Sequence, residues 1–304
     1  MSRRPRILIV GAAGQVGREL QRSFADAGEI VACGRGNGDL AAPDQLRAMV
    51  RSAAPDVILN AAAYTAVDRA ESEPEVAMAV NAQAPGILAE EALRANALLV
   101  HYSTDYVFDG SKAGPWVETD TPHPLNVYGA SKLAGEKAIQ QVGGKYLIFR
   151  TGWIYGPHGH NFLLTMLRLG RERESLDIVA DQFGAPTTSI ELADATCAIV
   201  SGVLAGQFGA SSDWAGLYHM TCGGSVSWCG FARAIFTHAN ALLDGKMPAV
   251  NPIPSSGYLT PARRPQNSVL SNEKLRSRFG VCLAPWETAL DEAVRRLTSQ
   301  QPQV

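Results

Sequence analysis

The N-terminal half of the chain alternates short apolar runs with amphipathic stretches, and this alternation restricts the fold more than any other feature. Apolar runs of strand length lie at residues 6–10, 29–33, 56–60, 97–103 and 145–151. Helical patterns lie between them, at residues 14–27, 42–53, 74–96 and from 126 onward. Strands that alternate with helices form right-handed βαβ units around a parallel sheet. We therefore predict a doubly wound α/β fold whose ligands bind at the carboxyl ends of the strands.

The alternation weakens in the second half of the chain. Helical patterns lie at residues 161–174, 189–206, 225–243, 271–280 and 284–297, and one strand pattern at 216–224. Residues 247–268 are dense in proline and glycine and are expected to be irregular. We predict that residues 1–150 form the sheet domain and that residues 151–304 form mainly a smaller, mostly helical substrate domain. Some of the later segments are expected to return to the first domain.

The composition is typical of a globular protein from a reducing compartment. Of 304 residues, 46% are hydrophobic and 18% charged, and the net charge of −2 gives no sign of a nucleic-acid surface. No apolar run reaches the ~18 residues of a membrane span. The five cysteines are an odd number without CxxC spacing, which argues against a disulfide framework and a zinc site. A cytoplasmic protein with small-molecule ligands is therefore expected.

A glycine-rich loop, GAAGQVG, joins the first apolar run to the first helix and contains Gly11, Gly14 and Gly17. Glycine lets the backbone turn tightly and approach a pyrophosphate, whose charge the N–H groups at a helix start stabilise. The spacing is GxxGxxG rather than GxGxxG, and a strand–helix turn without a ligand gives the same pattern. Its place in the first βαβ unit favours a dinucleotide cofactor bound to a Rossmann-type domain.

The loop after the second strand indicates which dinucleotide binds. The chain there reads ACGRGNGDL, with Arg35 near the strand end and no acidic residue at it. An acid would bind the ribose 2′-hydroxyl of NAD, whereas an arginine suits the 2′-phosphate of NADP. NADPH is therefore the predicted cofactor, and NADH remains possible because Arg35 could also be a solvated loop residue.

Residues that follow the second and third strands are also candidates to contact the cofactor. Asp39 and Leu40 are candidates to border the adenine, although an exposed loop acid is an equal alternative. The third strand is followed by three alanines that would let the backbone pass close to the cofactor, or that simply pack: Ala61, Ala62 and Ala63.

The stretch NVYGASKLAGEKA supplies a tyrosine and a lysine four residues apart, Tyr128 and Lys132. A helix places residues i and i+4 on one face. The pKa of a free tyrosine is about 10, and a nearby ammonium lowers it, so the pair can act as a proton donor with its tuning cation. Such a pair also occurs by chance. The small residues between the two, Gly129 to Ser131, are expected to leave room for the cofactor and the substrate.

The fourth strand ends in HYSTDYVFDG, which places Ser103 and Thr104 in the same predicted crevice. Thr104 would hold the substrate oxygen beside Tyr128, although a Ser-Thr pair can also cap a turn. A glycine loop, a hydroxyl at the fourth strand end and a YxxxK helix together favour a reductase active site with Tyr128, Lys132 and Thr104 as its catalytic residues. The set resembles that of the extended short-chain dehydrogenase/reductase superfamily.

A narrower resemblance covers residues 6–299. The segments HYSTDYVFDG, ETDTPHPLNVYGASKLAGEKA, LIFRTGWIYG, DQFGAPT and RRPQNSVL together are similar to the dTDP-4-dehydrorhamnose reductase family. The resemblance implies reduction of the 4-keto group of a dTDP-linked 6-deoxy-L-sugar by NADPH. It implies that Tyr128 protonates the keto oxygen and that Lys132 binds the nicotinamide ribose. It further implies substrate contacts from Asp105 and Trp153, where core packing is the alternative for the indole.

The same resemblance assigns cofactor contacts to several residues. They are Gly14, Gln15, Val16, Asp39, Leu40, Ala61, Ala62, Ala63 and Tyr102. In the C-terminal part, Arg264 is a candidate for the substrate diphosphate or a solvated loop arginine. His101 and His219 are both expected to be structural.

The chain departs from the family pattern at two places. Gly34 and Arg35 replace the acid that family members often carry after the second strand, which favours NADP. Some members are described with a magnesium ion at a dimer interface, where this chain has Glu19, Ile190 and Arg296. One acid does not make a site for a hard cation. We expect no metal in the catalytic step, and a homodimer remains possible.

Two other functions fit parts of the same evidence. The first is another enzyme of the superfamily, such as a nucleotide-sugar epimerase, a dehydratase or a reductase for a different keto sugar. The second is a regulatory subunit that binds NADP without catalysis, but such proteins tend to lose the catalytic residues that this chain retains.

Overall fold

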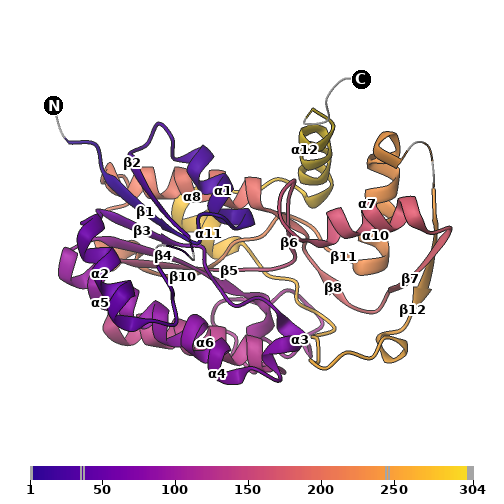
Figure 1. Cartoon of the computed structure of the whole chain (residues 1–304), viewed down its shortest axis with the longest axis horizontal. Helices are drawn as coiled ribbons and strands as arrows, with labels where there is room; N and C mark the ends of the chain where they lie inside the picture. The colour runs from indigo at the N-terminus through magenta and orange to yellow at the C-terminus, as the bar shows by residue number, and fades with distance from the viewer. Residues whose placement is uncertain (1–2, 35, 37, 244, 246, 300–304) are drawn as a thin grey trace.

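The central element of the computed structural model, which describes residues 3–34, 36, 38–243, 245 and 247–299, is a parallel sheet of six strands (Figure 1). The strand order is β10-β5-β4-β3-β1-β2, and each neighbouring pair is parallel. The strands are β1 Arg6–Val10, β2 Glu29–Cys33, β3 Val57–Asn60, β4 Leu98–Thr104, β5 Tyr146–Thr151 and β10 Gly216–His219. The predicted fold class is confirmed.

Helices cover both faces of this sheet because alternate strand residues point to opposite sides. Leu8 and Val10 pack toward α2, α5 and α6, whereas Ile7 and Ile9 pack toward α1 and α8. The helices and helical turns around the sheet are α1 Gln15–Ser23, α2 Pro43–Ala53, α3 Val67–Ala70, α4 Pro74–Met78, η1 Ala79–Gln83, α5 Ala84–Ala95, η2 Asp105–Val107, α6 Val127–Val142, α8 Ser189–Leu204, α9 Ser211–Trp214 and α11 Glu273–Phe279. The strands paired on both sides are thus buried, except for Arg6 and Tyr146 at the starts of β1 and β5.

The strand order reverses at β1, which has β2 on one side and β3 on the other. In doubly wound sheets this point opens a crevice at the carboxyl ends of the strands. The loops that follow β1 and β3 border it. One is the glycine loop, and the other contains Ala61 to Ala63.

The second half of the chain contributes to two regions. Strand β10 pairs with β5, and α8 packs against α1, so both belong to the sheet layers. The other elements lie on the right and at the top of Figure 1. They are β6 Ile154–Tyr155, α7 Phe162–Glu172, β7 Ser175–Val179, β8 Phe183–Gly184, β9 Thr187–Thr188, β11 Val226–Ser227, α10 Trp228–His238, η3 Asn240–Leu243, β12 Ala249–Ile253, η4 Ser255–Gly257 and α12 Trp286–Ser299.

Several elements of the second half, such as β7 and the short strand β11, were not expected from the sequence. Two further differences have a clear physical reason. Strand β12 lies within the segment expected to be irregular and pairs in parallel with β7; it tolerates Pro252 because β7 is its only partner among the described strands. The helix expected over residues 74–96 is interrupted by the π-helical turn η1. Pro85 follows this turn and lacks the N–H that an uninterrupted α-helix needs. Among the described residues, no helix is both long and apolar enough to cross a membrane.

Candidate active site

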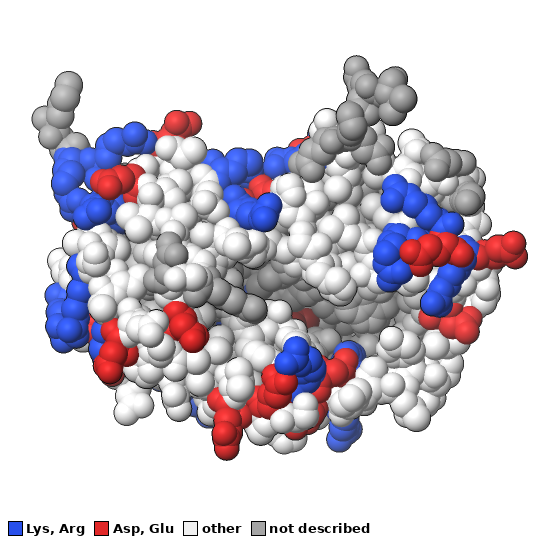
Figure 2. Space-filling model, in the orientation of Figure 1, with Lys and Arg blue, Asp and Glu red and all other residues white. Residues whose placement is uncertain are grey.

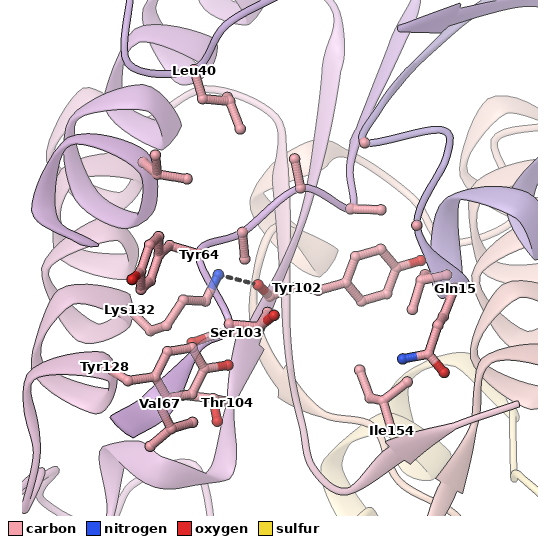
Figure 3. A pocket seen from close by; sticks show the side chains of 18 of the residues that line it. Gln15, Leu40, Tyr64, Val67, Tyr102, Ser103, Thr104, Tyr128, Lys132 and Ile154 are labelled. Atoms are coloured by element: carbon pink, nitrogen blue, oxygen red, sulfur yellow. Dashed lines mark hydrogen bonds between the residues drawn. The ribbon is translucent and has the colours of Figure 1, made fainter. Parts of the chain in front are cut away.

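A cavity of about 1230 Å³ lies at the carboxyl ends of β1, β3, β4 and β5. Figure 2 shows a hollow near the middle of this face whose visible surface is mostly uncharged. The glycine loop lines one part of the cavity, and the residues around Tyr128 line another (Figure 3). Trp153 and Trp228, from the second half of the chain, also line it. The cavity therefore joins the predicted cofactor and substrate regions.

The glycine loop is shaped by close backbone contacts. Gly11 has a φ of +83°, and a Cβ there would lie 2.7 Å from the amide nitrogen of Ala62. A Cβ at Gly17 would lie 2.2 Å from the carbonyl oxygen of Gly11. Gly14 begins α1 without a side-chain cap. The loop thus brings the start of a helix against the cavity, an arrangement suited to a diphosphate.

Most of the expected cofactor residues line this cavity. They are Gly11, Gly14, Gln15, Val16, Asp39, Leu40, Ala61, Ala62, Ala63, Tyr102, Tyr128 and Lys132. Gly17 is not in the lining; its role in the structure is the close packing of α1 on the loop. Arg35 lies outside the described residues. Gln15 also accepts a 2.9 Å hydrogen bond from Asn161, which joins the glycine loop to the second half of the chain.

The helix α6 holds Tyr128 and Lys132 on its cavity face. Its first turn is capped by the side chain of Asn126, which accepts a 2.8 Å hydrogen bond from the Gly129 amide. Lys132 is 1% exposed, and its ammonium donates to the Tyr102 carbonyl at 2.6 Å (Figure 3). Of the small residues between them, Gly129 serves a different purpose from the one expected. A Cβ at Gly129 would lie 2.2 Å from the Tyr106 carbonyl, so this glycine makes room for the protein backbone.

Burial controls the proton affinity of both side chains. It raises the pKa of Tyr128 to about 12, and a hydrogen bond with Thr104 opposes this shift. Burial lowers the pKa of Lys132 to about 8, and the negative charge of Glu136 opposes it. The expected lowering of the Tyr128 pKa is therefore outweighed by desolvation of the phenolate. The phenol keeps its proton at neutral pH, as a proton donor must.

Thr104 and Asp105 are buried side by side at the end of β4. The Thr104 hydroxyl donates to the Asp105 carboxylate at 3.0 Å and accepts from the Tyr106 amide at 3.2 Å. Asp105 is 2% exposed, and its burial raises its pKa to about 6. A Cβ at Gly152 would lie 2.4 Å from its second oxygen, so only glycine leaves space for this carboxylate.

Trp153 is held in an unusual backbone conformation beside the cavity. Its φ is +50°, and its indole stacks on that of Trp228 with ring centroids 3.4 Å apart and planes 3° from parallel. Both rings line the cavity and present an apolar wall to it. Trp153 therefore lines the cavity, and its contact with a sugar stays a prediction.

Arg264 is the expected substrate residue that the structure places away from the cavity lining. Its guanidinium bonds to both carboxylate oxygens of Asp68, at 2.8 and 3.2 Å, and to the Ala262 carbonyl at 3.0 Å. These contacts fasten the loop after η4 to α3.

Sequence reasoning missed several lining residues. They are Tyr64, Val67, Arg69, Glu73, Val76 and Trp228. Tyr64 follows directly on the three alanines, so its loop position could have indicated it. Trp228 has no local signal, because it reaches the cavity through the packing of α10.

No group of three or more potential metal ligands occurs among the residues with a described position. The side chain of Glu19, considered above for a magnesium ion, instead pairs with Arg22 at 2.7 Å and with Arg296 at 3.4 Å.

Known proteins share this sequence and this architecture. The model of the family described as RmlD substrate binding domain matches residues 5–299. A dTDP-4-dehydrorhamnose reductase of Burkholderia thailandensis is 51% identical over 298 residues, which cover 97% of this chain and 100% of that protein. One from Escherichia coli is 45% identical over 296 residues, which cover 96% and 97%.

A solved structure is also similar to this chain in fold. The dTDP-4-dehydrorhamnose reductase of Bacillus anthracis in complex with NADP superposes with a TM-score of 0.87, at 35% identity over 96% of this chain and 99% of that one. With its glycine loop, its Tyr128 and Lys132 on one helix face, and this extent of similarity, the chain belongs to the dTDP-4-dehydrorhamnose reductase family.

Proposed function

We propose that the chain uses NADPH to reduce the 4-keto group of dTDP-4-dehydro-6-deoxy-L-mannose, giving dTDP-L-rhamnose. The observation that carries the proposal is the meeting of Tyr128, Lys132 and Thr104 in one cavity with the glycine loop, in a chain of this family. The relatives named above carry the same activity in their names.

The lining residues fit a dinucleotide. The absence of side chains at Gly11 and Gly14 and the uncapped start of α1 suit a diphosphate, next to the backbone of Gln15 and Val16. Asp39 and Leu40 would border the adenosine, and Ala61, Ala62, Ala63 and Tyr102 the rest of the cofactor. Bound NADPH supplies the hydride that adds to the substrate carbonyl.

Three side chains of this protein handle the proton. As the carbonyl oxygen gains negative charge, the Tyr128 hydroxyl gives it a proton, because an alkoxide is more basic than a phenolate. Lys132 stabilises the phenolate left behind and would hold the cofactor ribose. Thr104 lines the same cavity as Tyr128 and would position the reacting oxygen beside the Tyr128 hydroxyl.

Other residues are proposed to hold the rest of the substrate. Asp105 would accept hydrogen bonds from sugar hydroxyls, and Trp153 would lie against the apolar face of the deoxysugar. Arg264 could reach the diphosphate only by leaving Asp68. Its contacts support an indirect role, in which it holds the loop that borders the substrate region.

Replacing the proton donor tests the proposal. We expect Tyr128→Phe to lower turnover of the 4-keto sugar by about 10²–10⁴-fold, as measured by NADPH oxidation, since general acid catalysis contributes factors of this size. Tyr146→Phe, at the start of β5, is the matched control and should leave turnover unchanged. Wild-type turnover in the Tyr128 variant would sink this mechanism. A purified protein that carries NAD and consumes no NADPH would indicate an epimerase instead.

The cofactor preference is tested at Arg35. If this guanidinium binds the 2′-phosphate, Arg35→Ala should raise the KM for NADPH by about 10-fold or more, the value of a hydrogen bond between charged groups, and leave that for NADH nearly unchanged. Steady-state kinetics with both cofactors measures the ratio. An equal effect on the two cofactors would assign the preference to another group.

We further propose a cytoplasmic location and a homodimer. The five cysteines, at positions 33, 197, 222, 229 and 282, are all unpaired, which supports a reducing compartment. The dimer rests on the family resemblance. Cell fractionation and light scattering of the purified protein test the two statements separately.

A further inference from the structure

His101 is a fully buried titratable residue that the mechanism above does not use. It lies on β4, three residues before Thr104, and its exposed fraction is 0%. Its Nε2 is 3.2 Å from the Lys132 ammonium nitrogen, and its Nδ1 is 3.0 Å from Nδ2 of Asn60. A histidine expected to be structural thus touches the cation of the active site.

Counting donors and acceptors assigns the direction of this contact. An ammonium carries three N–H groups and no acceptor, so Lys132 donates both to the Tyr102 carbonyl at 2.6 Å and to the imidazole. Nε2 must then be the acceptor, and the proton of the neutral ring lies on Nδ1. Nδ1–H then donates to the Asn60 amide oxygen once that amide is turned from the placement with Nδ2 toward the ring, and this oxygen gives up the 3.3 Å hydrogen bond that it accepts from the Ala62 amide.

We propose that His101 is a positioning residue for Lys132. Its Nε2 and the Tyr102 carbonyl fix two of the three N–H directions of the ammonium, and the third is left for the cavity that Lys132 lines. With its amide oxygen turned toward Nδ1, Asn60 in turn holds the imidazole in the tautomer whose Nε2 accepts. The chain Asn60–His101–Lys132 therefore determines where the active-site cation sits.

The surrounding charges support a neutral ring. Burial and the positive charge of Lys132 hold the pKa of His101 well below its ordinary value. The titratable groups on the elements packed against β4 include Tyr128 and Glu136 on α6, Glu91 on α5, Arg150 on β5, and Asp105 directly after β4. Arg150 pairs with Glu136 at 2.7 Å, and Arg51 pairs with Glu91 at 2.7 Å. Glu136 favours the charged form of Lys132. The arrangement is thus one ammonium beside one uncharged acceptor.

The tautomer can be observed without any activity assay. In the wild-type protein labelled with ¹⁵N-histidine, two-bond ¹H–¹⁵N correlations distinguish protonation at Nδ1 from protonation at Nε2. The signal of His101 is assigned by its loss in His101→Gln. We expect protonation at Nδ1. Protonation at Nε2 would overturn the inference, because the ring could then not accept from the ammonium.

Kinetics provide the second test. This test rests on the proposed function, because it measures turnover of the keto sugar. Turnover is measured as a function of pH. His101→Phe removes a hydrogen-bond acceptor that stabilises the charged form of Lys132, so the pKa of Lys132 should fall further. The alkaline limb of kcat should move to lower pH, and turnover at neutral pH should drop about 10-fold. His101→Gln, whose amide oxygen can accept a hydrogen bond from Lys132, should restore most of the turnover and most of the position of the alkaline limb.

His219→Phe is the matched control. His219 is also fully buried, but its Nδ1 contacts the Trp116 carbonyl at 3.2 Å and not Lys132. We expect it to lower the melting temperature without moving the alkaline limb. If the wild-type protein is active and the alkaline limb of His101→Phe is unshifted, the inference is rejected and the proposed function stands. A wild-type protein without activity on the keto sugar would reject the proposed function and leave the tautomer result standing.

Discussion

Lys132 and Asp105 are buried beside the same cavity, and burial moves their pKa values toward each other. The pKa of Lys132 falls to about 8 and that of Asp105 rises to about 6, in both cases mainly through desolvation of the charged form. The two groups are charged at the same time only at pH values between these two pKa values. The site is therefore tuned to the pH range in which an ammonium and a carboxylate coexist within it.

The raised pKa of Asp105 predicts a stability effect with a definite sign. Because the folded state binds this proton more tightly than the unfolded state, the contribution of Asp105 is favourable at low pH and is lost as the pH rises through about 6. Asp105→Asn, which carries no charge, should raise the free energy of unfolding at pH 8. The gain should be about 1 kcal/mol smaller at pH 5.

Urea unfolding at the two pH values measures this difference. Asp26→Asn, at an exposed position after α1, is the control and should change stability little at either pH. A gain in Asp105→Asn that is the same at pH 5 and pH 8 would contradict the assignment. The variant should also lose turnover, because its carboxylate is proposed to hold the sugar.

At the scale of elements, the sequence predicts most of what local patterns determine. The five N-terminal strands lie within one or two residues of their expected bounds, because buried parallel strands are continuous apolar runs. Tyr128 and Lys132 share a helix face because a spacing of four residues places them there. Their surroundings could not be predicted in the same way.

The features that the sequence did not reveal arise from tertiary contacts. The rise of the Tyr128 pKa comes from burial, and the contact of His101 with Lys132 comes from the register of β4 against α6. The π-helical turn η1 places Asn81 where it bonds to the Tyr64 backbone and to Ser131 at 3.0 Å. Trp228 reaches the cavity from a helix 75 positions after Trp153 (228 − 153), a pairing that no local pattern indicates.

At the scale of the molecule, the two halves of the chain complete each other. Leu147 and Phe149 of β5 are fully buried, and α8 and the elements around it cover their side of the sheet. A chain truncated after residue 150 should therefore expose this face and aggregate, although it contains the predicted cofactor domain. Size-exclusion chromatography of the truncated and full-length chains checks this. A monomeric, folded fragment that binds NADPH would show that the first 150 residues are an autonomous domain.

The pairing of β10 with β5 also has a consequence in time. Leu147 faces Gly216, so 69 residues (216 − 147) must be synthesised after one strand before its neighbour exists. At about 5–20 residues per second, a ribosome needs roughly 3–14 s for this interval. During this interval, the N–H and C=O groups on the open edge of β5 have no partner strand. A chaperone is therefore most useful to the nascent chain at this stage.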